Sequence, residues 1–146
     1  MSKNIKASAT IAETTRFVLP NDTNTLGNLM GGNLLSWLDI NAAIAAHRFC
    51  KRVVVTASVN HVAFEKSIKL GQIVTIVSKV SRSFNSSMEV YSDVYVEDSA
   101  TGKKQKCNEA IYTFVAVDES GNPVSVPPLD PQTDEEKSRY DAALRR

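Results

Sequence analysis

The chain has 146 residues, of which 42% are hydrophobic and 23% are charged. This length and balance are typical of one globular domain with a sizeable core, so we expect a single domain over residues 1–146. Seventeen Lys and Arg against sixteen Asp and Glu leave a net charge of +1, which argues against nucleic acid as a partner.

No segment predicts a secretory signal or a membrane span, because no apolar run approaches the roughly 18 residues that a span needs. Cys50 and Cys107 match no metal or redox spacing, and we interpret them as reduced packing residues. The chain also lacks a P-loop and a dinucleotide fingerprint. We therefore expect a cytoplasmic protein with no metal site, no membrane partner and no separate cofactor.

The N-terminal third predicts a flexible end, a strand, a loop and a helix. Residues 1–12 are polar and are expected to be flexible, whereas residues 14–19 favour a short strand that Pro20 ends. Residues 21–32 are rich in Asn, Asp and Gly and predict a loop. From about residue 32 to residue 50 the chain contains good helix formers and no proline.

This predicted helix is apolar almost all the way round. Its main apolar face comprises Leu34, Leu35, Leu38, Ala42, Ala45, Ala46 and Phe49. Trp37 and Ile44 fall on the other side, and Asp39 is its only charged residue before the last turn. Such a helix must be buried, so we expect a twisted sheet to wrap it or a second copy of the protein to cover it.

The remainder of the chain alternates like antiparallel strands and ends in a helix. The expected strands are residues 53–64, 73–81, 88–97 and 105–117, joined by short polar turns. Thr133 and Glu136 form a capping box at the start of a charged C-terminal helix over residues 132–146. The fold class is therefore α+β, with a five-stranded antiparallel sheet around one long buried helix.

The segment NDTNTLGNLMGGNLLSWLDINAAIAAH (21–47) resembles the hotdog-fold acyl-CoA thioesterases, and more narrowly their acyl-CoA hydrolase branch. The resemblance continues through VVVTASVNHVAFEKSIKLGQIV and the later strands, although Ser67 stands where proline is common. It implies a hotdog fold whose minimal unit is a homodimer with joined sheets, further assembled as a trimer of dimers. It also implies active sites that lie between the helix of one protomer and a loop of its partner.

Asp39 is the candidate catalytic group. Thioester hydrolysis needs a base more than an acid, because the thiolate of CoA leaves readily. A carboxylate on an apolar helix suits that task, since desolvation raises its basicity. The resemblance assigns the matching aspartate as general base or as direct nucleophile. The structural alternative is an aspartate held by an ion pair or a helix end.

Two polar side chains are expected to assist Asp39. The resemblance matches Asn24 to an asparagine that orients the water or the thioester carbonyl of the partner's site, with Asn28 as the next candidate. Asn21 lies in the same loop, and any of the three could instead be an ordinary turn residue. Thr56 lies on the first strand after the helix, where its hydroxyl could hold the water or Asp39, or could simply pack in a β-branched strand.

Gly31 and Gly32 come directly before the helix and are expected to form an oxyanion hole. Glycine allows close backbone approach, and a helix start presents free N–H groups, of which Gly32 is the favoured donor. The phosphates of CoA would need basic and hydroxyl groups at the entry. The candidates are Arg82, Ser83, Ser86 and Ser87 in one turn, with Lys66 and Lys69; all are also common surface residues.

Three other functions compete with hydrolysis. A hotdog dehydratase would need a histidine near a Gly-x-Pro segment, which is absent, and His47 and His61 read as a helix-end and a strand residue. A non-catalytic acyl-CoA-binding regulatory domain is the main alternative. A plain dimerisation module would not need an aspartate on the apolar helix.

Overall fold

The computed structural model describes residues 4–63 and 66–146. Its main sheet has five antiparallel strands in the order β2-β4-β5-β6-β3. The strands are β2 (Ala12–Phe17), β3 (Val53–Ala63), β4 (Ile73–Ser83), β5 (Ser87–Glu97) and β6 (Lys104–Val117). The α+β class, the five strands and their antiparallel pairing are therefore as the sequence predicts, with strand boundaries that differ by at most two residues.

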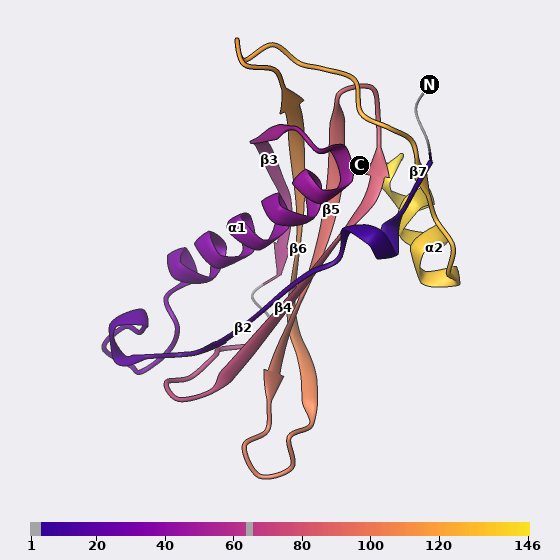
Figure 1. The fold of residues 1–146 in the computed structure, drawn as a ribbon. Helices are drawn as coiled ribbons and strands as arrows, with labels where there is room; N and C mark the ends of the chain where they lie inside the picture. Colours follow the sequence, from indigo (N-terminus) through magenta and orange to yellow (C-terminus); the bar gives the residue numbers. More distant parts are fainter. Residues whose placement is uncertain (1–3, 64–65) are drawn as a thin grey trace.

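The helix α1 (Gly31–Cys50) crosses one face of this sheet (Figure 1). Small side chains allow a close approach, because Ala42, Ala45 and Ala46 are fully buried against the strands. Phe49 and Leu38 complete the contact, and the side chains of β4 to β6 that face the helix form the rest of the core. The hydrophobic core thus lies between α1 and the sheet.

The sheet covers α1 on one side only. Ile40 is 57% exposed and Ile44 is 39% exposed, so the helix is apolar on a side that this protomer leaves open. Trp37, which the prediction grouped with Ile44, is nevertheless buried, and the Arg16 guanidinium lies 4.4 Å above its ring. β3 is an edge strand, and its Val59, which pairs with Tyr112 on the helix side of the sheet, is also exposed.

The helix α2 (Asp134–Ala143) lies on the opposite face of the sheet. Successive residues of a strand point to opposite faces, and Ser78 bonds to α1 whereas Lys79 bonds to Glu136 of α2. The capping box between Thr133 and Glu136 is present as predicted. Arg139 and Arg146 add ion pairs to Asp93 and Glu89 of β5, so charged contacts fix α2 to this face.

The flexible N-terminus predicted for residues 1–12 is wrong over residues 5–12. β1 (Ile5–Lys6) pairs in parallel with β7 (Leu129–Asp130), and the 3-10 helix η1 (Ala7–Thr10) buries Ala7 and Thr10. Polar composition suggested fraying, but pairing with a distant proline-rich segment supplies the backbone partners. Residues 1–3 lie outside the described residues.

Candidate active site

Asp39 lies on the open side of α1, beside the edge strand β3. The Thr56 hydroxyl donates a hydrogen bond of 2.8 Å to Asp39 Oδ1. Asp39 is partly exposed and Thr56 is exposed, which differs from the buried aspartate expected from the apolar helix. The carboxylate is therefore positioned by α1, oriented by β3, and accessible to a ligand or a partner molecule.

Tyr112 of β6 lies beneath this part of α1. It is buried, and its hydroxyl donates to the backbone carbonyl of Leu35 at 3.1 Å. Burial, and after it the negative charge of Asp39, raise the pKa of Tyr112 to about 12. Tyr112 thus stays neutral at physiological pH and ties α1 to the sheet one turn before Asp39. Its place in an alternating strand is the only cue to Tyr112 in the sequence.

The loop before α1 is held together by Asn24. Its side-chain oxygen accepts hydrogen bonds from the backbone N–H groups of Leu26 and Asn28, at 2.9 and 3.1 Å. Gly27 makes this tight loop possible, because its φ of +77° is readily adopted only by glycine. Asn24 has the local role of a turn residue, and its exposed side chain leaves the amide NH₂ as the group that can face outward.

Asn28 is in a different environment from Asn24. Its side-chain oxygen is buried and has no hydrogen-bond partner within the described part of the chain. It lines a cavity of about 240 Å³ together with Gly31, Leu34, Lys66 and Asn108. This cavity borders the start of α1. Asn28 and Gly31 both line it, whereas Asn24 is not among its lining residues.

Gly31 and Gly32 are the first two residues of α1, whereas the prediction placed them directly before the helix. Met30 caps the helix without a side-chain hydrogen bond, so the cap residue supplies no side-chain acceptor for the first N–H groups. A side-chain carbon added to Gly32 would meet nothing within 4 Å. Within the described residues, no neighbouring atom excludes a larger side chain at position 32.

The helix separates these two groups of residues. Gly32 and Asp39 are seven residues apart on α1, which is about 10 Å along its axis. Asn24 belongs to the loop of residues 23–30, which leads into the start of α1 (Figure 1). Within one protomer, the structure therefore brings together Asp39 and Thr56 but keeps Asn24 and Gly32 at a separate place.

The residues proposed for the CoA phosphates do not form one cluster in the protomer. Arg82 ends in contact with α2, where its guanidinium donates to the Tyr140 carbonyl at 2.9 Å and stacks on the Tyr140 ring. Ser83 accepts a hydrogen bond from Leu129 N–H, and Ser86 and Ser87 lie at the turn that follows. Lys66 and Lys69 lie beyond the other end of β4, a strand of about 35 Å.

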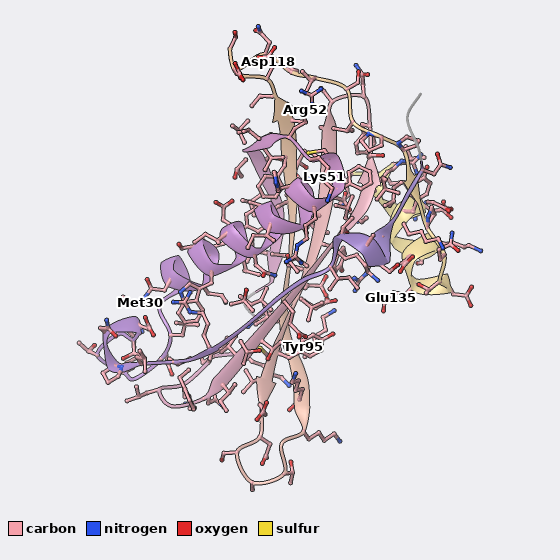
Figure 2. The ribbon with its side chains drawn as sticks, viewed as in Figure 1. Met30, Lys51, Arg52, Tyr95, Asp118 and Glu135 are labelled. Atoms are coloured by element: carbon pink, nitrogen blue, oxygen red, sulfur yellow. The ribbon has the colours of Figure 1, made fainter. Side chains whose placement is uncertain are left out.

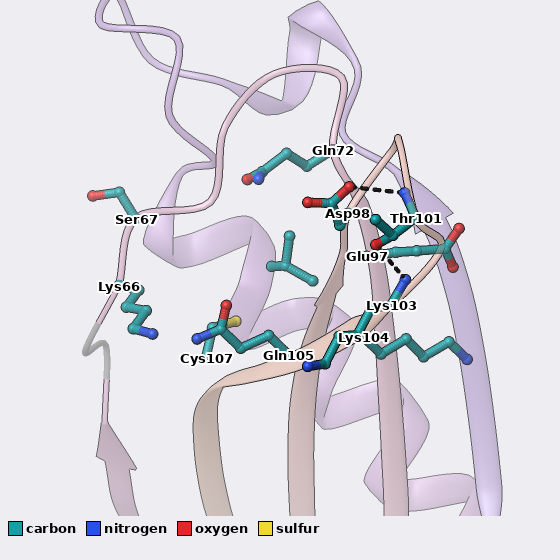
Figure 3. Close-up of a pocket in the computed structure, with 11 residues that line it drawn as sticks. Lys66, Ser67, Gln72, Glu97, Asp98, Thr101, Lys103, Lys104, Gln105 and Cys107 are labelled. Atoms are coloured by element: carbon teal, nitrogen blue, oxygen red, sulfur yellow. Dashed lines mark hydrogen bonds between the residues drawn. The ribbon is translucent and has the colours of Figure 1, made fainter.

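Lys66 instead faces a second cavity at the β5–β6 hairpin. This cavity of about 480 Å³ is bordered by Lys66, Lys103, Lys104 and Gln105, together with the acidic Glu97 and Asp98 (Figure 3). Asp98 accepts hydrogen bonds from the backbone of Ala100 and Thr101, so it shapes the hairpin. The mixed charge of this lining gives it no clear preference for an anion.

The other candidate residues have structural surroundings. His47 lies in the last turn of α1. Its ring nitrogen Nδ1 is 2.8 Å from the carbonyl oxygen of Arg52, the residue labelled just after α1 in Figure 2. Nothing is described for the side chain of His61. Cys50 and Cys107 are free, as predicted. Within the described residues, no cluster of His, Cys, Asp or Glu could hold a metal ion, and no helix is long and apolar enough to cross a membrane.

Comparison with known proteins identifies the family. The model of the Thioesterase superfamily matches residues 26–103. The chain is 40% identical over 136 residues to the uncharacterized acyl-CoA thioester hydrolase YkhA of Bacillus subtilis, covering 93% of this chain and 78% of that protein. It also matches mouse acyl-coenzyme A thioesterase 11 at 39% identity, but spans only 23% of that longer protein.

Solved structures agree over almost the whole chain. An acyl-CoA hydrolase from Staphylococcus aureus, in complex with butyryl coenzyme A and coenzyme A, has a TM-score of 0.94 and 37% identity over 98% of this chain and 87% of that one. Alanine variants of that hydrolase replace an asparagine, an aspartate 15 residues later and a threonine 17 residues after it. Asn24, Asp39 and Thr56 have the same residue types and the same spacing.

An apo-hexameric acyl-CoA thioesterase is equally similar, with a TM-score of 0.94 and 38% identity over 98% of this chain and 92% of that one. The matched family model covers more than half of the chain, and the Bacillus subtilis relative covers nearly all of it. The helix, the curved sheet and these matches together show that the chain belongs to the thioesterase superfamily and has the hotdog fold.

Proposed function

We propose that the protein is an enzyme that hydrolyses acyl-CoA thioesters to CoA and a carboxylic acid. The observation that carries this proposal is the accessible Asp39 carboxylate, oriented by the Thr56 hydroxyl at 2.8 Å on an otherwise apolar stretch of helix. Relatives at 37% to 40% identity over nearly the whole chain are named acyl-CoA hydrolases. The reaction needs no cofactor, since CoA is part of the substrate.

In the proposed reaction, Asp39 accepts a proton from a water molecule, whose oxygen then attacks the thioester carbonyl. The carbonyl oxygen becomes an oxyanion, for which the N–H groups of Gly31 and Gly32 at the start of α1 are the donors. The C–S bond breaks, the CoA thiolate leaves, and the proton from Asp39 restores the thiol. In the alternative, Asp39 attacks the carbonyl itself and water hydrolyses the resulting anhydride.

The complete site requires two protomers in this proposal. Asp39 and Thr56 of one chain would meet Asn24 and Gly32 of the partner, because the helix separates these groups within one protomer by about 10 Å or more. The exposed apolar Ile40 and Ile44 of α1 and the exposed Val59 of the edge strand β3 support such a contact. We propose a homodimer as the minimal unit and a trimer of dimers as the assembly, supported by the hexameric relative.

We propose that the CoA phosphates bind at the turn that contains Arg82, Ser83, Ser86 and Ser87. The guanidinium of Arg82 already has the Tyr140 carbonyl and ring as partners, so the hydroxyls of Ser86 and Ser87 are the groups more open to a ligand. Lys66 would serve a different part of the substrate, because it lies towards the cavity of Asn28 and Gly31. The cytoplasmic location stays a prediction.

The test is a steady-state assay of thiol release over acyl-CoA chain lengths, with the wild-type protein and the variant Asp39→Ala. We expect hydrolysis by the wild type and a loss of kcat of at least about 1,000-fold in the variant, because it lacks its base. Asp118→Ala, in a surface turn, is the matched control. Full activity of Asp39→Ala would exclude the mechanism. Single-turnover incorporation of oxygen-18 into Asp39 would separate nucleophile from base.

A further inference from the structure

The residue Asn41 is buried on the sheet side of α1, two positions after Asp39. It is 1% exposed and sits among the apolar residues of the core. Its amide NH₂ donates to Ser78 Oγ at 2.7 Å and to the Ala12 carbonyl at 3.0 Å, with the Ile76 carbonyl at 3.4 Å. Its carbonyl oxygen accepts from Thr14 Oγ1 at 2.7 Å. Every polar atom of this amide therefore has a partner.

These bonds tie α1 to three strands at once. Thr14 and Ala12 belong to β2, Ile76 and Ser78 to β4, and Ser78 Oγ lies 2.7 Å from Ser92 Oγ of β5. A buried amide would cost free energy if it were unpaired, so this network favours one placement of the helix over its neighbours. Asn41 takes part in none of the steps of the proposed reaction.

The apolar contacts around Asn41 are poor at fixing that placement. Ala42, Ala45 and Ala46 form most of the face that approaches the sheet, and burial of alanine depends little on direction. Hydrogen bonds depend strongly on distance and angle. The rotation and axial position of α1 are therefore set more by Asn41 than by its alanine neighbours.

A small rotation of α1 would matter at Asp39. Asn41 and Asp39 lie on opposite sides of the helix, since two residues correspond to about 200°. A rotation of about 20° moves a side chain at a radius of about 5 to 6 Å by about 2 Å. This is enough to break the 2.8 Å bond from Thr56 to Asp39. A displacement of about 1 Å can cost a catalytic site about 100-fold in rate.

We propose that Asn41 is a positioning residue that fixes the register of α1 and thereby holds Asp39 against Thr56. The proposal rests on the hydrolytic function proposed above. It predicts that the amide can be removed with the fold intact and that the loss will appear in kcat rather than in KM. Asn41 does not face the side of the helix where a substrate would bind.

The experiment compares Asn41→Leu with a triple variant that adds Thr14→Val and Ser78→Ala. Leucine keeps the approximate volume of asparagine but leaves the Thr14 hydroxyl without its acceptor and the Ser78 hydroxyl with Ser92 alone, so we expect reduced thermal stability. The triple variant removes both hydroxyls and should recover part of that stability, because Ser92 then loses its Ser78 partner. Val94→Ala, fully buried in β5 and outside the network, is the control for destabilisation alone.

In both Asn41 variants we expect kcat to fall about 10- to 100-fold, with KM within about threefold of wild type. The fluorescence of Trp37, the single tryptophan, supplies a readout besides activity, because it lies one turn before Asn41 on the same side and under Arg16. Its emission should change in both variants and not in Val94→Ala. Recovery of kcat together with stability in the triple variant would overturn the proposal.

Failure of the proposed function would look different. If wild-type protein hydrolysed no acyl-CoA, the assay would be silent for every variant and the hydrolytic proposal would fail. Trp37 emission would still report whether Asn41 sets the helix register, and unchanged emission in both Asn41 variants would refute that role by itself.

Discussion

At the residue scale, the described site depends on one short contact between a helix and an edge strand. Asp39 and Thr56 are 17 positions apart in the sequence and meet only because β3 runs beside α1. The threonine hydroxyl donates to the carboxylate and therefore fixes the orientation of the acid.

We predict that Thr56→Val lowers kcat about 10- to 100-fold with little change in thermal stability, since Thr56 is exposed and valine fits a β-strand. Thr56→Ser retains the hydroxyl and should recover most of the activity. The measurement is kcat and KM for both variants on one acyl-CoA. Equal activity of the valine and serine variants would show that the hydroxyl has no role.

The loop asparagines give a second prediction at this scale. Asn24→Ala should lower kcat more than Asn28→Ala, because we assign the substrate-facing amide to Asn24. Asn24→Asp retains an oxygen that can close the loop but replaces the NH₂ donor with a charged carboxylate oxygen, so it tests the donor role separately from the loop role. If Asn28→Ala proved more damaging in a steady-state assay, the unpaired Asn28 oxygen would become the better candidate.

At the scale of elements, α2 is held to the sheet mainly by charge. Glu136 is buried, pairs with Lys79 at 3.0 Å and caps α2 through Gln132 N–H at 2.8 Å. Burial acts to raise the pKa of Glu136, but the hydrogen bonds from Gln132 and Lys79 outweigh it and leave this pKa below its usual value.

A lowered pKa means that folding favours the ionised form, so the stabilisation is present above the unfolded-state pKa and is lost as pH falls through the folded-state pKa. Glu136→Gln keeps the cap acceptor and removes the charge. We expect it to cost on the order of 1 kcal/mol at pH 7 and much less near pH 3. Thermal unfolding at both pH values checks this. A difference that did not shrink in acid would contradict it.

At the scale of the whole molecule, a site shared between two protomers predicts complementation. Asp39→Ala and Asn24→Ala should each be nearly inactive alone. A mixed dimer of the two retains both native residues at one of its two sites, so the isolated mixed dimer should have about half of wild-type activity. Co-expression with two different tags, followed by assay of the doubly purified species, measures it. No recovery in isolated mixed dimers would show that both residues act within one chain.

How far the sequence predicts the molecule differs between parts of the chain. Hydrophobic periodicity identified α1 and the long strands, because burial on one face leaves a regular pattern in the residues. The capping box at Thr133 and the loop glycine at position 27 follow from local chemistry. The pairing of β1 with β7 could not be predicted, since two-residue strands carry no periodicity and their partner lies more than 120 residues away.

The sequence by itself determined the fold class, the apolar helix and Asp39 as its one acid before the last turn, because these depend on residue type and spacing. Only the tertiary structure decided that Thr56 reaches Asp39, that Tyr112 lies beneath the helix and that Asn41 is fully bonded. It also corrected the expectation of a buried acid: Asp39 is partly exposed. Such contacts join residues far apart in the chain, and they depend on the position of α1 over the sheet, which no local pattern encodes.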